Sequence, residues 1–157
     1  MPESASPPSA LDAAPAAPDW QVCGLHRSYV HGDVVFLQFR GAASETELAT
    51  LLEPIWQTQQ RYGRAFVMLD ASAAVPITAD QRRFLATWYR DHPTQGGTVV
   101  FGASIVLRAT VALLNAAARL LSGRSFVQER FVATEEHAWQ ALREARRKLL
   151  SSPSEPR

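Results

Sequence analysis

The chain of 157 residues contains very little cysteine and lysine, and each shortage excludes a class of protein. Cys23 is the single cysteine, so an intramolecular disulfide and a cysteine-based zinc cluster are both excluded. Lys148 is the single lysine among sixteen basic residues, a bias that, with the many alanines, is typical of GC-rich bacterial genes. The net charge of +1 provides no bulk attraction to nucleic acid or to acidic membranes.

A secretory signal and a long apolar run are absent as well. The first eight residues lack the basic start and the apolar stretch of a secretory leader. The most apolar stretch is interrupted by Arg108 and Arg119, so it falls short of the roughly 18 residues that a membrane helix needs. We therefore expect a cytoplasmic protein in a reducing environment, without a membrane span.

The motifs of common enzyme classes are missing too. The four histidines, at positions 26, 31, 92 and 137, show no metal-binding spacing, and neither a Gly-x-Ser-x-Gly elbow nor a phosphate-binding glycine loop occurs. Asp70 ends a predicted strand as a lone carboxylate, whereas acid–base chemistry usually needs a second group. We predict a protein that is not an enzyme and that uses no metal or cofactor. Nucleic acid is not an expected partner, because the scattered arginines are typical of a solvated face.

The residues that are present predict one folded domain with two tails. An apolar content of 46% with 20% charged residues is typical of a globular core. Residues 1–18 hold five of the ten prolines, with alanine and serine between them, which predicts a disordered tail. Residues 151–157 predict a shorter tail of the same kind, and residues 19–150 therefore form the expected domain.

Strands and helices alternate along this domain. Two strands, over residues 20–29 and 34–39, flank the turn signal at His31–Gly32–Asp33, which favours an antiparallel hairpin. Apolar runs predict three more strands, at 64–70, 98–101 and 125–132. Four helices are expected, with N-caps at Ser44, Thr78, Ser104 and Thr134.

Two residues are expected to shape the first helix. Pro54 lies inside its apolar pattern and should kink or restart the helix, because proline lacks the amide donor. Gly63 is expected to end it. Helices placed between strands imply parallel pairings with right-handed crossovers, so the fold class is α/β, with a mixed sheet, an opening hairpin and about four helices packed on it.

This order of elements, with the strand Phe66-Val-Met-Leu-Asp-Ala-Ser72, resembles a STAS domain, the fold of anti-sigma-factor antagonists and of the cytoplasmic parts of sulfate transporters. More specifically, the chain resembles the bacterial STAS-like proteins that are grouped with the lipid-binding SEC14 fold. The resemblance covers residues 20–150. It implies a non-catalytic protein–protein interaction module in bacterial regulation that self-associates. The alternative that it implies is a SEC14-like carrier or sensor of a hydrophobic small molecule.

The resemblance also points to two candidate regulatory residues. In the antagonists, a serine in an Asp-Ser-Ser/Thr-Gly stretch at the start of the next helix is phosphorylated. Here that stretch reads Val75-Pro-Ile-Thr-Ala-Asp-Gln81, without the Asp-Ser and without the glycine. Thr78 is the hydroxyl at the helix start, and Ser72 lies nearer the strand end. A role of Thr78 as N-cap, with Gln81 three residues on, would account for it fully.

The third predicted helix, over residues 105–121, is apolar almost all round, apart from one stripe with Arg108, Asn115 and Arg119. A surface helix ordinarily needs an apolar face only a little wider than 100°. Either neighbouring helices bury both flanks, or a protein partner, a second copy or a lipid-like ligand covers the excess. The candidate interaction surface consists of Leu107, Arg108, Val111, Leu113 and Leu114.

Overall fold

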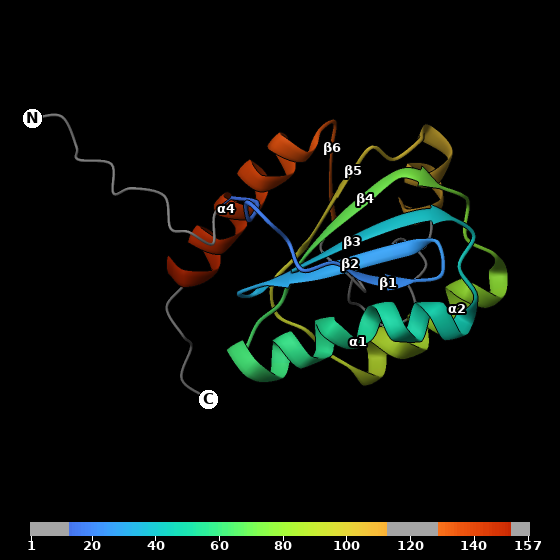
Figure 1. The fold of residues 1–157 in the computed structure, drawn as a ribbon, viewed down its shortest axis with the longest axis horizontal. Coiled ribbons are helices and arrows are strands. Elements are labelled where there is room, and N and C mark those ends of the chain that lie inside the picture. Colours follow the sequence, from blue (N-terminus) through green and yellow to red (C-terminus); the bar gives the residue numbers. More distant parts are fainter. Residues whose placement is uncertain (1–12, 113–128, 152–157) are drawn as a thin grey trace, which may run out of the picture.

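A six-stranded mixed sheet organises residues 13–112 and 129–151, which the computed structural model describes (Figure 1). The strands lie side by side in sequence order: β1 (Gln21–Cys23), β2 (His26–His31), β3 (Val34–Gly41), β4 (Phe66–Ala74), β5 (Thr98–Phe101) and β6 (Glu129–Val132). The pairs β1–β2 and β2–β3 are antiparallel, and the pairs from β3 to β6 are parallel. The predicted α/β class, with a mixed sheet and an opening hairpin, is confirmed.

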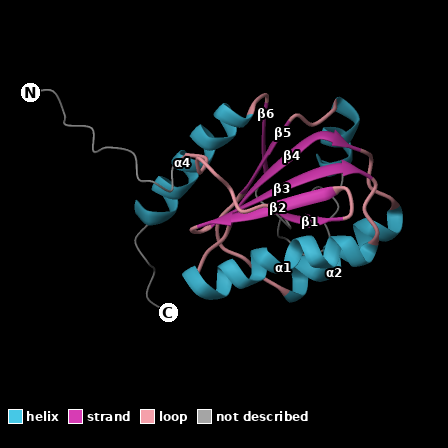
Figure 2. Ribbon diagram, viewed as in Figure 1, coloured by secondary structure: helices cyan, strands magenta, loops and turns pink. Residues whose placement is uncertain are grey.

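Helices cover both faces of this sheet (Figure 2). On one face lie α1 (Glu45–Tyr62) and α2 (Ala79–Asp91), and on the other lies α4 (Glu135–Ser151). A further helical stretch, residues 105–112, packs Leu107 on the β5 residue Val100. No helix within the described ranges is long and apolar enough to cross a membrane.

The alternation of side chains along each strand divides the core into two layers. Phe36, Phe66 and Met68 face α4 and pack with its Trp139 and Leu142. The intervening residues of the same strands face the other way and form a second cluster with α1 and α2, which includes Val35, Leu37, Val67, Leu51 and Trp88. The sheet is therefore buried on both sides, as parallel strands with near-continuous apolar runs require.

The predicted caps set the helix boundaries. Ser44 and Glu47 form a capping box, with the Glu47 amide donating to Ser44 Oγ at 3.2 Å and the Ser44 amide to Glu47 Oε2 at 2.7 Å. Gly63 ends α1 in the left-handed conformation, φ 70°. Pro54 lies inside α1, which continues from residue 45 to residue 62, so the helix does not restart there.

Two strand predictions need correction. The segment 20–29 is not one strand, because Gly24 adopts a positive φ of 59° and the chain turns back, which pairs Cys23 with His26 across β1 and β2. The sheet therefore has six strands where the sequence predicted five. In addition, β4 does not end at Asp70 but continues to Ala74, because its last residues pair with the end of β3. Residues 113–121 of the third predicted helix and 125–128 of the last predicted strand lie outside the described residues.

A candidate ligand pocket between α2 and the sheet

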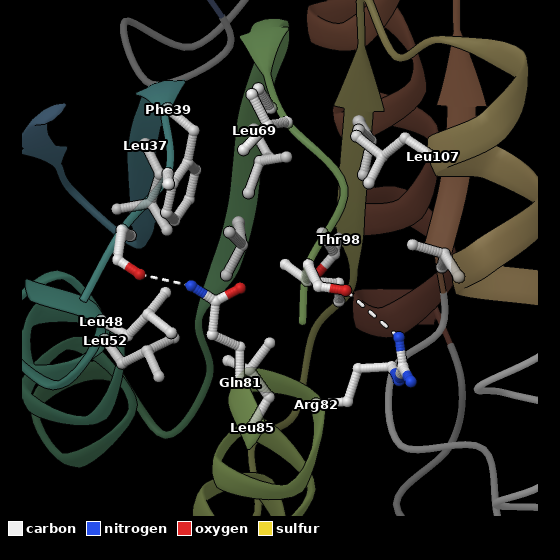
Figure 3. A pocket seen from close by; sticks show the side chains of 18 of the residues that line it. Leu37, Phe39, Leu48, Leu52, Leu69, Gln81, Arg82, Leu85, Thr98 and Leu107 are labelled. Atoms are coloured by element: carbon white, nitrogen blue, oxygen red, sulfur yellow. Dashed lines mark hydrogen bonds between the residues drawn. The ribbon is translucent and has the colours of Figure 1, made fainter. Parts of the chain in front are cut away.

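The face of the sheet that carries α1 and α2 also holds a pocket of about 180 Å³ (Figure 3). Strands β3, β4 and β5 form its floor, α2 lies opposite, and α1 and the helical stretch 105–112 close its flanks. The apolar residues that line it include Leu37, Phe39, Leu48, Leu52, Val67, Leu69, Val75, Ile77, Leu85, Val100, Leu107, Val111 and Phe131.

The floor of the pocket follows from the two-residue period of the strands. Leu37 and Phe39 of β3, Val67 and Leu69 of β4, and Val100 of β5 all point to the same face. The register places them in neighbouring rows, with Leu37 opposite Leu69 and Leu69 opposite Val100. An apolar floor without a charged group therefore extends across three strands.

The space above the floor exists because α2 packs lightly on the sheet. Trp88 is the single buried residue of this helix, and Leu85 and Tyr89 are half-buried. The helix presents Gln81, Arg82, Leu85, Ala86 and Tyr89 to the pocket, and this spacing places all five on one side of it. Phe84, Leu85 and Tyr89 pack against the core cluster of the sheet while staying partly exposed, so α2 fills the space above the floor incompletely.

Gln81 ties the start of α2 to the segment between β3 and α1. Its Oε1 accepts the Thr78 amide at 2.8 Å, and its Nε2 donates to the backbone carbonyl of Ala43. Both polar atoms of the Gln81 side-chain amide are therefore hydrogen-bonded, and this side chain connects α2 to Ala43 at one side of the pocket. In Figure 3, Gln81 extends towards the side of Leu48, and Arg82 extends towards the side of Leu107.

Arg82 is the one charged residue in the part of the pocket lining that the structure describes. Its side chain is half-buried, and Nη1 donates to the backbone carbonyl of Ile77 at 3.1 Å. Thr98, which is buried at the start of β5, adds a hydroxyl to the same lining. A mostly apolar pocket with a few polar groups is the usual form of a small-molecule site.

The structure divides the predicted interaction surface. Leu107 is buried and Val111 is half-buried, and both line the pocket. Arg108 is exposed, and its Nε donates to the carbonyl of Ala103 at 3.2 Å. Leu113 and Leu114 lie outside the described residues.

The two candidate regulatory residues, Thr78 and Ser72, are not among the described residues that line the pocket. Thr78 is the N-cap of α2, as predicted, and its hydroxyl accepts the Gln81 amide at 3.2 Å. Ser72 is exposed near the end of β4, and its hydroxyl donates to Asp70 Oδ1 at 2.6 Å. Burial would raise the pKa of Asp70, but hydrogen bonds from Ser72 and Gln38 outweigh it and hold the pKa below its usual range. Asp70 is therefore an ionised, hydrogen-bonded carboxylate and is not suited to act as a general acid.

The sequence did not identify the polar groups of the pocket. Arg82 is one of the scattered arginines that the sequence predicts on a solvated face, and Thr98 is predicted only as the first residue of a strand. No local signal separates Arg82 from Arg83, its exposed neighbour in α2. The weak apolar face of α2, limited to Phe84, Leu85 and Trp88, was the one feature that could have indicated a helix standing off its sheet.

Comparisons with known proteins add no assignment. A scan against protein-family models gives no match, and a search of curated proteins gives none. Within residues 13–112 and 129–151, no group of three or more histidine, cysteine or acidic side chains could hold a metal ion. The pocket is therefore the feature on which a function can be argued.

Proposed function

We propose that this protein binds a hydrophobic small molecule in the pocket between α2 and the sheet, as a carrier or a sensor of that molecule. The observation that supports this proposal is an apolar cavity of about 180 Å³ beneath a helix that buries only Trp88. Protein interiors are packed to the density of organic crystals, and voids much larger than a water molecule are few. A cavity of this size between helix and sheet can hold a small ligand.

The composition of the lining favours binding over catalysis. Among the described residues of the lining, the polar side chains are Gln81, Arg82, Tyr89 and Thr98, and no carboxylate, imidazole or thiol is found. Carboxylates, imidazoles and thiols are the groups most used in general acid–base and nucleophilic catalysis, so the described lining offers the hydroxyls of Tyr89 and Thr98 alone for such a role. The lining thus supports a binding protein that is not an enzyme.

The expected affinity from apolar contact alone is modest. A single aromatic ring buries about 150 Å², which at about 25 cal/mol per Å² contributes about 4 kcal/mol. That corresponds to a dissociation constant of about 1 mM, before the cost of immobilising the ligand is included. A ligand that binds tightly must therefore also use the polar groups of the lining.

Benzene is a suitable probe of the cavity itself, because an apolar cavity of similar size is known to bind it. In ligand-observed NMR, the full chain should bind benzene. Ala86→Phe, which adds a ring to the pocket lining of α2, should abolish binding, whereas Thr87→Phe, on the exposed side of the same helix, should not. Absence of benzene binding to the unmodified chain would overturn the proposal. Native mass spectrometry of the gently purified protein would show any ligand carried from the cell.

A second candidate function is a STAS-like protein–protein interaction module, which the exposed start of the helical stretch 105–112 favours. Ile105 and Val106 are 86% and 60% exposed, and they are adjacent. Light scattering at micromolar concentration should then show self-association that Ile105→Glu abolishes. Thr87→Glu, at an exposed position of α2, adds the same charge on a different helix and should leave it unchanged. A monomeric unmodified chain would contradict self-association.

A further inference from the structure

We infer that the ligand of this pocket is a small organic monoanion, whose anionic group binds Arg82 and whose apolar part is about one aromatic ring or six to eight carbons long. This inference rests on the proposed function and specifies its ligand class. Two independent observations carry it, namely the charge state of the lining and the size of the cavity.

The arginines of α2 differ in their partners. Arg83 pairs with Asp80 at 3.2 Å, and Arg90 pairs with Asp91 at 2.9 Å, so each is neutralised by a carboxylate of its own helix. Arg82 differs from both. Its guanidinium donates to the Ile77 carbonyl, and it has no carboxylate partner in the described ranges of the chain.

A ligand that fills the pocket would take water away from this half-buried guanidinium, and a cation that loses its water needs an anion to compensate for the loss. A guanidinium has five N–H donors, and the bond to the Ile77 carbonyl uses one of them. The other donors match a carboxylate, which arginine binds in a bidentate, planar geometry. No acidic side chain is among the lining residues within 13–112 and 129–151, so none of these repels an approaching anion.

The second observation is the size of the cavity. About 180 Å³ is only slightly larger than the roughly 150 Å³ cavity that holds benzene. It is well below the range of about 300–1,000 Å³ for pockets that enclose drug-sized ligands. A single ring or a short alkyl chain therefore fits, whereas a two-chain lipid does not fit within it.

Isothermal titration calorimetry of the full chain with octanoate and 1-octanol tests the anionic group. These two probes have the same chain length and differ in charge. Octanoate should bind at least tenfold more tightly than 1-octanol. Arg82→Gln should lower the affinity for octanoate to that for 1-octanol. Arg83→Gln, on the same helix but outside the described lining, should leave the affinity for both probes unchanged.

A series of butanoate, hexanoate, octanoate and dodecanoate tests the size. Affinity should rise about fourfold for each buried methylene and then level off near octanoate. Equal binding of octanoate and 1-octanol to the unmodified chain would overturn the anionic group. A rise that continues to dodecanoate would overturn the size limit. If benzene binds, either of these results overturns the inference alone and leaves the proposed function supported. If benzene does not bind, the proposed function and the inference are both overturned.

Discussion

Arg146 of α4 donates a hydrogen bond to the carboxylate of Asp33, which lies 113 positions earlier in the turn between β2 and β3. Arg64, two residues before β4, donates to the other carboxylate oxygen at 2.6 Å. The Asp33 side chain is 1% exposed and that of Arg146 is 10% exposed. The backbone carbonyl of Asp33 also accepts the Phe66 amide at 2.8 Å. One aspartate therefore joins the hairpin turn, the start of β4 and the helix on the opposite face from α1 and α2.

Replacement of this carboxylate should be strongly destabilising. Asp33→Asn keeps the size of the side chain but removes the buried negative charge that faces the guanidinium of Arg146. The loss of one partner from a buried ion pair costs about 3–5 kcal/mol. Urea denaturation should show a loss of this size in the free energy of unfolding, with little change in the slope against urea concentration.

Asp80→Asn is the matched control for that substitution. Asp80 pairs with Arg83 on the surface of α2, and its side chain is 75% exposed. Exposed pairs contribute about 1 kcal/mol or less. Equal losses for the two variants would contradict the role assigned to Asp33.

The same site predicts how stability depends on pH. Burial would raise the pKa of Asp33, but hydrogen bonds and charge from Arg146 and Arg64 outweigh it and hold the pKa below its usual value. A carboxyl whose pKa is lower in the folded state contributes stability that is fully present above its unfolded pKa, about 4. That contribution is lost as the pH falls through the folded pKa.

The unfolding free energies of the unmodified chain and of Asp33→Asn should therefore converge as the pH falls from 5 towards 2. This comparison is needed because the pKa values of Asp70, Asp91 and Glu144 are also lowered, and these groups titrate in both proteins. A difference between the two proteins that stays constant over this range would refute the pH prediction.

The features predicted well from the sequence depend on residues close together in the chain. The capping box of Ser44 and Glu47, the N-cap Thr78 with Gln81, and the stop at Gly63 each involve at most a few positions. The order of strands and helices is also local, because it follows from the period of the apolar residues. These signals were sufficient for the α/β class and for the mixed sheet.

The features that were missed depend on contacts between distant segments. The turn at Asp33 was predicted, but its burial depends on Arg146, 113 positions away. The pocket depends on how far α2 stands from the sheet, and the spacing of apolar residues within α2 does not reveal that distance. The division of β1 from β2 depends on the positive φ of Gly24, a conformation that a glycine permits but does not require.

The N-cap of α2 offers a prediction on stability that bears on the candidate regulatory role of Thr78. Thr78→Ala removes the hydroxyl that accepts the backbone amide of Gln81 and should lower the free energy of unfolding by about 1 kcal/mol. Thr78→Ser keeps a hydroxyl at this position and should retain most of that stability. Thr50→Ala is the control, because the Thr50 hydroxyl donates to Thr46 within α1 and caps no helix end. It should change stability by less than about 0.5 kcal/mol. Equal stability of the threonine and alanine forms at position 78 would refute the capping role and leave a regulatory one to explain this residue.

Two glycines distinguish a backbone collision from conformational strain. A Cβ on Gly96 would lie 2.1 Å from the carbonyl oxygen of Ala65, at a φ of 128°. The neighbouring backbone cannot yield easily, because the Ala65 amide donates to the Gln95 carbonyl at 2.7 Å. Gly63, at φ 70°, has no atom within 4 Å of such a Cβ, so an alanine there meets strain alone.

Gly63→Ala should therefore lower the free energy of unfolding by about 1–2 kcal/mol, the penalty of a left-handed alanine. Gly96→Ala adds a collision to its strain and should lower it by more than about 3 kcal/mol. Thermal and urea denaturation of the two variants measure this difference directly. Similar losses in both would mean that the segment before β5 can move away from Ala65, and the close approach would then not constrain how β5 enters the sheet beside β4.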